Sequence, residues 1–403
     1  SSDTGSSDTG SSHAGRPDGA GLGAVTSSSH VVICCGSGGV GKTTTAAVIA
    51  LEAARSGRRA VVVTIDPARR LADALGLEGL TDTPSRIDGP WPGEMWALML
   101  DTKATFDGLV RRYAADPDQT ERILANSFYR NISGALSGTQ EYMASEKLYE
   151  LAEEGDWDLV VVDTPPTRNA LDFLDAPQRL ARFLDHRLYK VLMTPTRGFV
   201  KAVNVAAQAV TRSLSKVVGA EVIGDAIAFF QAFEGMEEGF QQRAARVDEL
   251  LRDRSTAFVL VASPKADTVA EAGYFADKLR ENGITVRGLI VNRMQPTFGH
   301  DEVDRLSAGG DAARERARTL AGTALGDHYV CLADARQLAR GEERHLGGLA
   351  ERVAPAPVVR VPVQPVEVTD LGSLSHLGDL LFDRGGTAGP SAGGDSGRPG
   401  ASG

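Results

Sequence analysis

The sequence predicts an α/β protein with a doubly wound, mostly parallel sheet and an inserted helical subdomain. Short apolar runs rich in β-branched residues indicate buried strands, as expected for a parallel sheet that is covered on both faces. Helical patterns separate most of these runs, and this alternation is typical of a doubly wound fold. The predicted strands are residues 30–35, 59–65, 95–100, 159–162, 257–262 and 286–291.

The helices predicted between these strands have apolar residues at helical spacing. They cover residues 43–56, 67–75, 139–154, 267–281 and 303–320. The alternation stops between residues 190 and 254, where the pattern favours two or more amphipathic helices. Residues 106–132 show the same pattern, so the helical subdomain is expected over about 104–155 and 190–254. Its apolar stripes either pack on one another or form a groove or lever that meets a partner.

The two ends of the 403-residue chain differ in composition from the rest. Residues 1–29 are rich in Ser, Gly, Asp and Thr, and residues 385–403 are rich in Gly, Ser, Pro and Ala. Neither segment has enough apolar residues to offset the entropy lost on ordering, so both are predicted to be disordered tails. The folded protein is expected to be residues 30–384.

Charge and cysteine content restrict the class of protein. The formal net charge is −10, which argues against nucleic acid as a partner, because such a surface must neutralise phosphates. The three cysteines form no Cys-x-x-Cys pair, so neither a zinc site nor a disulfide framework is indicated. With neither a long apolar run nor a signal-like N-terminus, we expect a cytoplasmic protein whose membrane contact, if it has one, is peripheral.

A phosphate-binding loop follows the first predicted strand. The pattern Gly-x-x-x-x-Gly-Lys-Thr between a strand and a helix lets backbone N–H groups surround phosphate oxygens. Lys42 is expected to reach the β and γ phosphates of ATP, and the Thr43 hydroxyl to bind Mg²⁺. The fold is therefore predicted to be of the P-loop NTPase type. The predicted nucleotide-binding residues are Gly36, Ser37, Gly38, Gly39, Val40, Gly41, Lys42, Thr43 and Thr44.

Two aspartates follow predicted strands at the edge where a nucleotide would lie. Asp66 ends the run Val-Val-Val-Thr-Ile-Asp-Pro, and Asp163 ends the run Leu-Val-Val-Val-Asp-Thr-Pro-Pro. Carboxylates at the carboxyl edge of a parallel sheet face the ligand crevice. One can hold the Mg²⁺ shell while the other orients or deprotonates the attacking water. The alternative is that each only caps the helix that follows it.

These motifs together resemble those of the ArsA-type ATPases, a family that includes arsenite-pump ATPases and ATPases that target tail-anchored membrane proteins. The Gly-rich loop at 36–45, a first switch at 66–75 and a second switch at 163–174 carry the resemblance. Plasmid-partition and septum-placing ATPases share the loop, but they usually lack the long helical insertion. These two families are therefore the second interpretation of the motifs.

The resemblance implies roles for particular residues. Asp66 would position or activate water and, with Lys42, form the catalytic pair; Asp163 would join Thr43 at the metal and γ-phosphate. Asn292, in the run Val-Asn-Arg, would contact adenine, and residues 361–370 would close over it. The resemblance also implies a dimer whose helical parts move with ATP hydrolysis, coupled to a membrane-related cargo or partner.

The sequence departs from this family at two points. The family carries a second lysine that crosses the dimer, and this chain has Ser37 there; such a cation is worth about 10³–10⁵ in rate. The chain therefore either pairs with a related subunit that keeps the lysine, or is a non-hydrolysing regulatory subunit of an unlike pair. Cys34 and Cys35 are expected on opposite faces of a strand, which makes arsenite binding improbable.

Overall fold

The computed structural model describes residues 19–66, 68–132, 139–165, 172–185, 220–296 and 312–382. Its strands in these ranges form one sheet of eight, in the order β3-β4-β2-β5-β1-β6-β7-β8. Neighbours pair in parallel except β3 and β4, which are antiparallel. The strands are β1 Val31–Cys35, β2 Arg59–Thr64, β3 Ser85–Ile87, β4 Glu94–Met99, β5 Leu159–Asp163, β6 Thr256–Ala262, β7 Val286–Met294 and β8 Val358–Pro362. The doubly wound, mostly parallel fold is confirmed.

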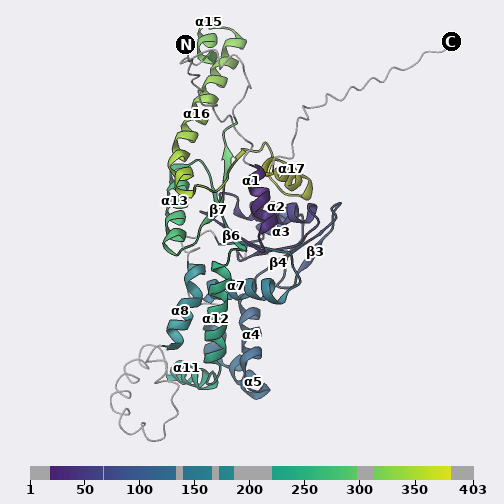
Figure 1. Cartoon of the computed structure of the whole chain (residues 1–403), viewed down its shortest axis with the longest axis vertical. Coiled ribbons are helices and arrows are strands. Elements are labelled where there is room, and N and C mark those ends of the chain that lie inside the picture. Colours follow the sequence, from purple (N-terminus) through teal and green to yellow (C-terminus); the bar gives the residue numbers. More distant parts are fainter. Residues whose placement is uncertain are drawn as a thin grey trace, which may run out of the picture.

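Helices cover both faces of this sheet, as the continuous burial of its central strands requires (Figure 1). One face packs against α1 Gly19–Ser28, α2 Lys42–Arg55, α3 Arg70–Leu75 and α17 Leu371–Leu381. The other packs against α7 Thr139–Tyr149, η1 Glu150–Glu154, α8 Asp172–Asp185, α12 Glu237–Arg252, α13 Ala266–Glu281 and α16 Ala324–Val353. Cys34 belongs to the first core and Cys35 to the second, so their side chains point to opposite faces, as predicted.

A separate group of helices extends from one end of the sheet (Figure 1). It contains α4 Thr102–Tyr113, α5 Pro117–Ala125, α6 Ser127–Ile132 and α11 Ala220–Ala232, together with α12. Aromatic residues dominate its core: Tyr129, Phe229, Phe233 and Phe240 are buried there. Helices are therefore present in both segments predicted for the subdomain, while residues 190–219 lie outside the described residues. α8, which the sequence did not assign to it, packs against α7 and α12.

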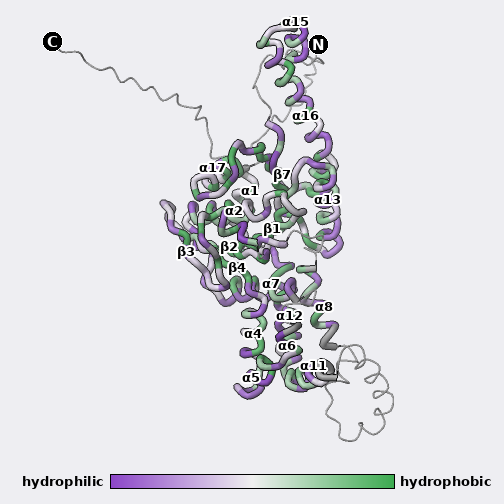
Figure 2. The backbone as a smooth tube through the Cα atoms, turned by 180° about the vertical axis from the view of Figure 1, so that it is seen from behind, coloured by the Kyte–Doolittle hydropathy of each residue, from purple (hydrophilic) through white to green (hydrophobic). Residues whose placement is uncertain are grey.

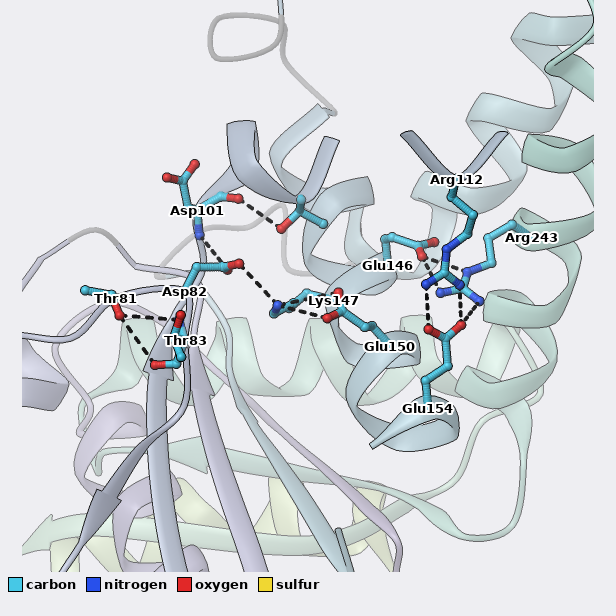
Figure 3. A network of polar contacts seen from close by, with 11 residues as sticks. Thr81, Asp82, Thr83, Asp101, Arg112, Glu146, Lys147, Glu150, Glu154 and Arg243 are labelled. Atoms are coloured by element: carbon cyan, nitrogen blue, oxygen red, sulfur yellow. Dashed lines mark hydrogen bonds and ion pairs between the residues drawn. The ribbon is translucent and has the colours of Figure 1, made fainter. Parts of the chain in front are cut away.

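Ion pairs fasten these helices together where they meet the sheet (Figure 3). The pair of Arg243 with Glu146 is buried, and the pair of Arg112 with Glu154 is partly exposed. Arg243 of α12 donates from Nε to Glu146 of α7 at 2.7 Å and from Nη1 to Glu154 of η1 at 2.7 Å. Arg112 of α4 forms a two-pronged pair with the same Glu154, at 2.5 and 2.7 Å. Four helical segments thus share one cluster of charges, which we call the clamp: Arg112, Glu146, Glu154 and Arg243.

The prediction of a disordered tail over residues 1–29 is wrong for residues 19–28, which form α1. Two apolar residues of this segment, Leu22 and Val25, are buried against the sheet. They were the feature of the sequence that could have indicated this helix. Arg58 then donates a hydrogen bond of 2.8 Å to the Ser29 carbonyl and a second bond to the Thr26 carbonyl. These contacts offset the entropy that ordering costs. Residues 1–18 lie outside the described residues.

Several elements near the C-terminus were not predicted. α16 is 30 residues long and projects beyond the sheet with α15 Ala312–Thr319 at its end (Figure 1). Figure 2 shows hydrophobic residues in the central strands and hydrophilic residues along much of this projection. The edge strands β3 and β8 and helix α17 were also missed. The helix predicted at 67–75 begins at Arg70, and residues 303–311 of the predicted 303–320 lie outside the described residues.

Candidate active site

The carboxyl ends of five parallel strands bring the predicted site residues to one edge of the sheet. The glycine-rich loop follows β1, Asp66 follows β2, and Asp163 is the last residue of β5. Asn292 lies near the end of β7, and residues 363–369 follow β8. Carboxyl ends that meet at a change in strand order are where ligands bind in such folds. The topology therefore gathers segments that are up to 333 residues apart in the sequence, since 36 and 369 mark the extremes.

Backbone conformation shapes the loop as a cradle. Gly36, Gly39 and Gly41 have positive φ angles of 152°, 75° and 96°, which L side chains rarely adopt. A Cβ at Gly36 would fall against the carbonyl oxygen of Val261, and one at Gly41 against the Asn292 amide. A Cβ at Gly39 would meet no atom within 4 Å. The loop is thus pressed against β6 and β7 on one side and open on the other.

Lys42 is buried with its ammonium folded back over this loop. Its Nζ donates to the backbone carbonyl of Ser37 at 2.9 Å, and the residue is 6% exposed. Burial lowers the pKa of Lys42, although the nearby Asp163 carboxylate opposes that effect. The Ser37 hydroxyl is buried and has no hydrogen-bond partner among the described residues. A buried cation and an unused hydroxyl beside an open backbone cradle fit an anion.

Asp163 lies beside Lys42 and is held by two threonines. Thr43 Oγ1 donates to Asp163 Oδ2 at 2.8 Å, and Thr64 Oγ1 donates to the same atom at 2.9 Å. The other oxygen, Oδ1, is buried and accepts no hydrogen bond from any described residue. Burial raises the pKa of this carboxyl from 3.8 to about 6, against the effect of the two hydroxyl bonds.

This group of oxygens fits Mg²⁺. The ion is usually held in nucleotide sites by one or two carboxylates and hydroxyls, together with phosphate oxygens and water. Asp163 Oδ1 is an unused buried acceptor next to the Thr43 hydroxyl, and an unpartnered buried polar atom requires an explanation. Thr43 and Asp163 would hold the ion, and their role as metal ligands stays a prediction.

Asp66 lies on the other side of Thr64. Its Oδ1 accepts a hydrogen bond of 3.0 Å from the Ala68 amide, and its Oδ2 lies 3.6 Å from Arg70 Nη1. The Asp66 amide donates to Thr64 Oγ1 at 3.3 Å. One threonine therefore links the two aspartates that the sequence singled out. The Ala68 amide precedes Arg69, which is the N-cap of α3, so its bond to Asp66 closes a turn ahead of the helix and does not cap it.

Thr64 is a site residue that sequence reasoning missed. It is paired in register with Asp163 on the neighbouring strand β5, and this pairing places its hydroxyl on the carboxylate. A threonine that ends a strand two residues before an aspartate is a weak signal by itself. Only the adjacency of β2 and β5 gives it meaning, and the sequence does not reveal which strands are neighbours.

Asn292 lies against the loop with both ends of its amide engaged. Nδ2 donates to the Val40 carbonyl at 3.0 Å, and Oδ1 accepts from the Arg293 amide at 2.9 Å. Arg293 has φ of 62°, and it alone has a positive φ among the described residues that are not glycine. Such a strained residue often marks a functional site. Asn292 therefore supports the loop directly, and its predicted contact with adenine stays a prediction.

A cleft of about 1020 Å³ opens over the glycine-rich loop. Asp163, which is 1% exposed, is not among the residues that line it. The walls of the cleft include Gly39, Gly41, Lys42, Thr43 and Thr44 of the predicted set, along with Asp66 and Asn292. Residues 363–369 form its opposite wall, where the resemblance places the closure over adenine. Arg70, Asp73 and Arg293 also line it and were not predicted to be site residues. The volume is at the upper end of the range for small-molecule sites.

Helix α7 touches the site directly. Gln140, in its first turn, donates a hydrogen bond of 3.1 Å to the Ile65 carbonyl, one residue before Asp66. The same helix carries Glu146 of the clamp. Half of the second switch, residues 166–171, lies outside the described residues.

Comparison with known families agrees with this geometry. The model of a family described as anion-transporting ATPase (ArsA_ATPase) matches residues 29–316, well over half of the chain. The chain belongs to the ArsA ATPase family. The matched part of this ArsA-type chain includes the loop, both aspartates, Asn292 and the helical subdomain, and ends before α16.

Relatives of this ArsA-type chain include ATPases from eukaryotes. An ATPase ASNA1 homolog of Trypanosoma cruzi is 25% identical over 245 residues, which are 59% of this chain and 63% of the relative. ATPase GET3B of Arabidopsis thaliana is 26% identical over 273 residues, 63% and 61% of the two chains. ATPase ARSA2 of Chlamydomonas reinhardtii is 26% identical over 249 residues, 61% and 62%. Less than two thirds of each relative's length is matched.

Two further observations concern cargo. Cys34 and Cys35 lie on opposite faces of the sheet and Cys331 is exposed on α16, so the three thiols of the ArsA-type chain do not converge on one ion. Within the described ranges, no helix has both the length and the hydropathy that crossing a bilayer requires. A stretch rich in basic residues also follows the second switch, over residues 179–201. Arg179 and Arg182 of this stretch lie on α8, and residues 186–201 lie outside the described residues.

Proposed function

We propose that this chain binds ATP with Mg²⁺ in the cleft over the glycine-rich loop and hydrolyses the γ-phosphate. The observation that carries the proposal is the contact of Thr43 with Asp163, whose second oxygen is buried and unused. Lys42 supplies a buried positive charge beside it. A hydroxyl, a carboxylate and an ammonium around an open backbone cradle form the set that phosphoryl transfer requires.

Each residue has a distinct part in this proposal. Bound Mg²⁺ would neutralise negative charge that develops on the phosphates. Thr43 and Asp163 would hold the ion, and Lys42 would leave the Ser37 carbonyl to meet the β and γ phosphates. Asp66 would orient the attacking water and accept its proton. Thr64 would keep the two aspartates at a fixed separation through its hydroxyl.

Movement of the helices is the second part of the proposal. The hydrogen bond between Gln140 and Ile65 joins α7 to the strand end that carries Asp66. The clamp joins α7 to α4 and α12. A change at Asp66 on hydrolysis would therefore displace helices as a group. We infer that the active assembly is a homodimer or a heterodimer with a related ATPase subunit, and that its work is done in the cytoplasm on a membrane-related cargo or partner. The motifs that resemble those of the ArsA-type ATPases support this inference.

A second candidate function follows from position 37. Ser37 is 7% exposed and carries no charge, so this chain offers no second cation from its loop. A regulatory subunit that binds ATP and does not hydrolyse it would need only the cradle, Lys42 and the Mg²⁺ site. The two candidates share nucleotide binding and differ in turnover.

Two substitutions at the site test both candidates together. Lys42→Ala removes the cation that meets the phosphates, so affinity for ATP with Mg²⁺, measured by titration calorimetry, is expected to fall at least about a hundredfold, with circular dichroism unchanged. Asp66→Asn keeps the shape of the side chain, so it should retain affinity within about threefold and lose most phosphate release.

The outcomes separate the hypotheses. Unchanged affinity in Lys42→Ala would exclude the cleft as the nucleotide site. Binding by wild type without phosphate release in any assembly would favour the regulatory subunit. Equal turnover in Asp66→Asn and wild type would show that Asp66 is not a catalytic residue.

A further inference from the structure

The cleft contains a second cation close to the phosphate cradle. Arg70, the first residue of α3, lines the cleft together with Lys42, Thr43 and Asp66. Arg70 and Lys42 therefore line one open cavity, and the Asp66 carboxylate beside Arg70 lines it too. Two cations on the walls of one cleft attract a polyanion.

The neighbouring arginine has a different environment. Arg69 Nη1 is 3.5 Å from the Glu78 carbonyl, outside the cleft wall. The two arginines are adjacent in sequence and both exposed, and only Arg70 belongs to the walls of the cleft. The chain thus provides a matched control for every substitution at Arg70.

The contact of Arg70 with Asp66 is weak enough to exchange. The Arg70 side chain is 58% exposed, and its Nη1 lies 3.6 Å from Asp66 Oδ2, which is longer than a hydrogen bond. Exposed pairs of this kind contribute about 0–1 kcal/mol. A guanidinium makes two parallel hydrogen bonds to a phosphate group, which are stronger and more specific. A triphosphate in the cleft would therefore compete successfully for Arg70.

We infer that Arg70 is a catalytic residue that leaves Asp66 to bind the terminal phosphate of ATP, and thereby frees Asp66 Oδ2 for the attacking water. This inference rests on the proposed ATPase function. The movement of Arg70 would have two consequences. It brings positive charge to the γ-phosphate from within the same subunit, and it releases the Asp66 carboxylate to orient water only when that phosphate is present.

The reaction balances with these groups. The water oxygen forms a bond to the γ phosphorus, and the bond from that phosphorus to the bridging oxygen breaks, with the electron pair departing on ADP. Asp66 takes the proton that water loses and returns it to the phosphate product. Arg70 stabilises the charge spread over the γ-phosphate oxygens as the bond breaks, the part that arginine residues supplied in cis or in trans play in related chemistry.

The test compares Arg70→Ala with Arg69→Ala in the full chain. Titration calorimetry with Mg²⁺ is expected to show ATP affinity reduced at least about tenfold in Arg70→Ala, with ADP affinity within about threefold of wild type, because ADP lacks the γ-phosphate that Arg70 meets. Phosphate release should fall at least about a hundredfold, and added guanidinium ion should restore part of it. Arg69→Ala should match wild type in every measurement.

Equal losses of ATP and ADP affinity in Arg70→Ala, or no loss of either, would overturn the inference, as would losses of the same size in Arg69→Ala. Because Arg70 is exposed, the fold should be preserved, and Arg70→Gln provides a second variant if alanine disturbs α3. The affinity measurement needs no turnover. A wild type that binds ATP without hydrolysing it would therefore contradict the proposed function and still decide whether Arg70 meets the γ-phosphate.

Discussion

Asp163 is the residue whose chemistry the fold changes most clearly. Its carboxyl is 1% exposed and receives two hydroxyl bonds on one oxygen, while the other has no partner among the described residues. Two neutral hydroxyl donors compensate only in part for the loss of water around a charge. A divalent cation would supply the missing compensation, so an empty site is less stable than a filled one at neutral pH.

The pH dependence of stability tests this account. The pKa of Asp163 in the folded protein, about 6, lies above the ordinary value of 3.8, so the folded state keeps the proton where the unfolded chain has lost it. The resulting stabilisation is full below pH 3.8 and is lost as the pH rises to about 6, an effect of about 3 kcal/mol. Asp163→Asn, neutral throughout, should exceed wild type by about 1 to 2 kcal/mol more at pH 8 than at pH 5.

Urea unfolding without nucleotide at the two pH values provides the measurement. Adding Mg²⁺ and ATP gives the control, because wild type should then gain stability at pH 8 and Asp163→Asn should lose most of that gain. A difference between variant and wild type that is the same at pH 5 and pH 8 would contradict the raised pKa.

For single residues, the sequence predicts those that belong to a motif. It does not predict residues whose role depends on which side chains are close to them in the folded protein. Lys42, Thr43 and Asp163 could be assigned because a fixed pattern places them on a strand end or a helix start. Thr64 and Arg70 have no such pattern. The role of Thr64 depends on the pairing of β2 with β5, and Arg70 differs from Arg69 only in the direction of its side chain.

Among the elements, the clamp explains how helices distant in the sequence behave as one unit. Glu154 lies in η1, a π-helical turn that continues α7, and turns of this kind are rare and often functional. Arg112 and Arg243 both bond to Glu154, and hydrogen bonds, chiefly from Arg112, lower its pKa to about 2. Burial raises the pKa of Glu146, against the effect of its bond to Arg243. The buried Arg243 guanidinium is therefore the group on which the others depend.

Removal of that guanidinium should be costly. Arg243→Met keeps the length of the side chain and leaves Glu146 buried without its cation, so the free energy of unfolding should fall by about 3–5 kcal/mol. Arg246→Met, at an exposed position on the same helix, should change it by less than about 0.5 kcal/mol. Adding Glu146→Gln to Arg243→Met should recover part of the loss, and equal effects of Arg243→Met and Arg246→Met in urea unfolding would contradict a structural role for the clamp.

Helices and strands could be predicted from the sequence where apolar and polar residues follow a clear pattern. The central strands are continuous apolar runs, whereas β3 has three residues and β8 alternates between buried and exposed positions at an edge. α16 has exposed apolar residues, including Leu325 and Leu338. These residues make the apolar face of the helix hard to recognise in the sequence. The clamp joins residues as far apart in the sequence as Glu154 and Arg243. No local pattern in the sequence predicts such a pair.

For the molecule as a whole, the sheet lies between the clamped helices at one end and the α15–α16 projection at the other (Figure 1). The cleft is lined by residues at the carboxyl ends of the strands of this sheet. The cations that line its described walls are Lys42, Arg70 and Arg293, and all belong to this chain. Position 37 adds none. A dimer in which each nucleotide requires a cation from the opposite subunit would thus be incomplete if it were built from two copies of this chain.

Restoring that charge is the direct test. The isolated chain should hydrolyse ATP slowly, and Ser37→Lys should raise phosphate release at least about tenfold, toward the 10³–10⁵ that trans-acting cations supply. Ser37→Gln, similar in length and uncharged, serves as the control. Mixing wild type with a lysine-bearing paralogue should also accelerate release, with one competent and one impaired site. A Ser37→Lys protein that dimerises with ATP in light scattering and gains no turnover would refute the crossing lysine and leave Arg70 as the remaining candidate.

The position of the indole rings has a consequence for optical spectroscopy. All three tryptophans of the chain, Trp91, Trp96 and Trp157, lie toward the amino ends of β4 and β5, away from the cleft. Trp96 and Trp157 meet edge to face at 5.7 Å, with the Arg59 guanidinium 4.6 Å from the Trp157 ring. Intrinsic fluorescence excited at the indole band therefore reports on one corner of the sheet and on the core that this corner shares with η1. An emission change on adding ATP would then indicate movement at that corner, away from the nucleotide itself.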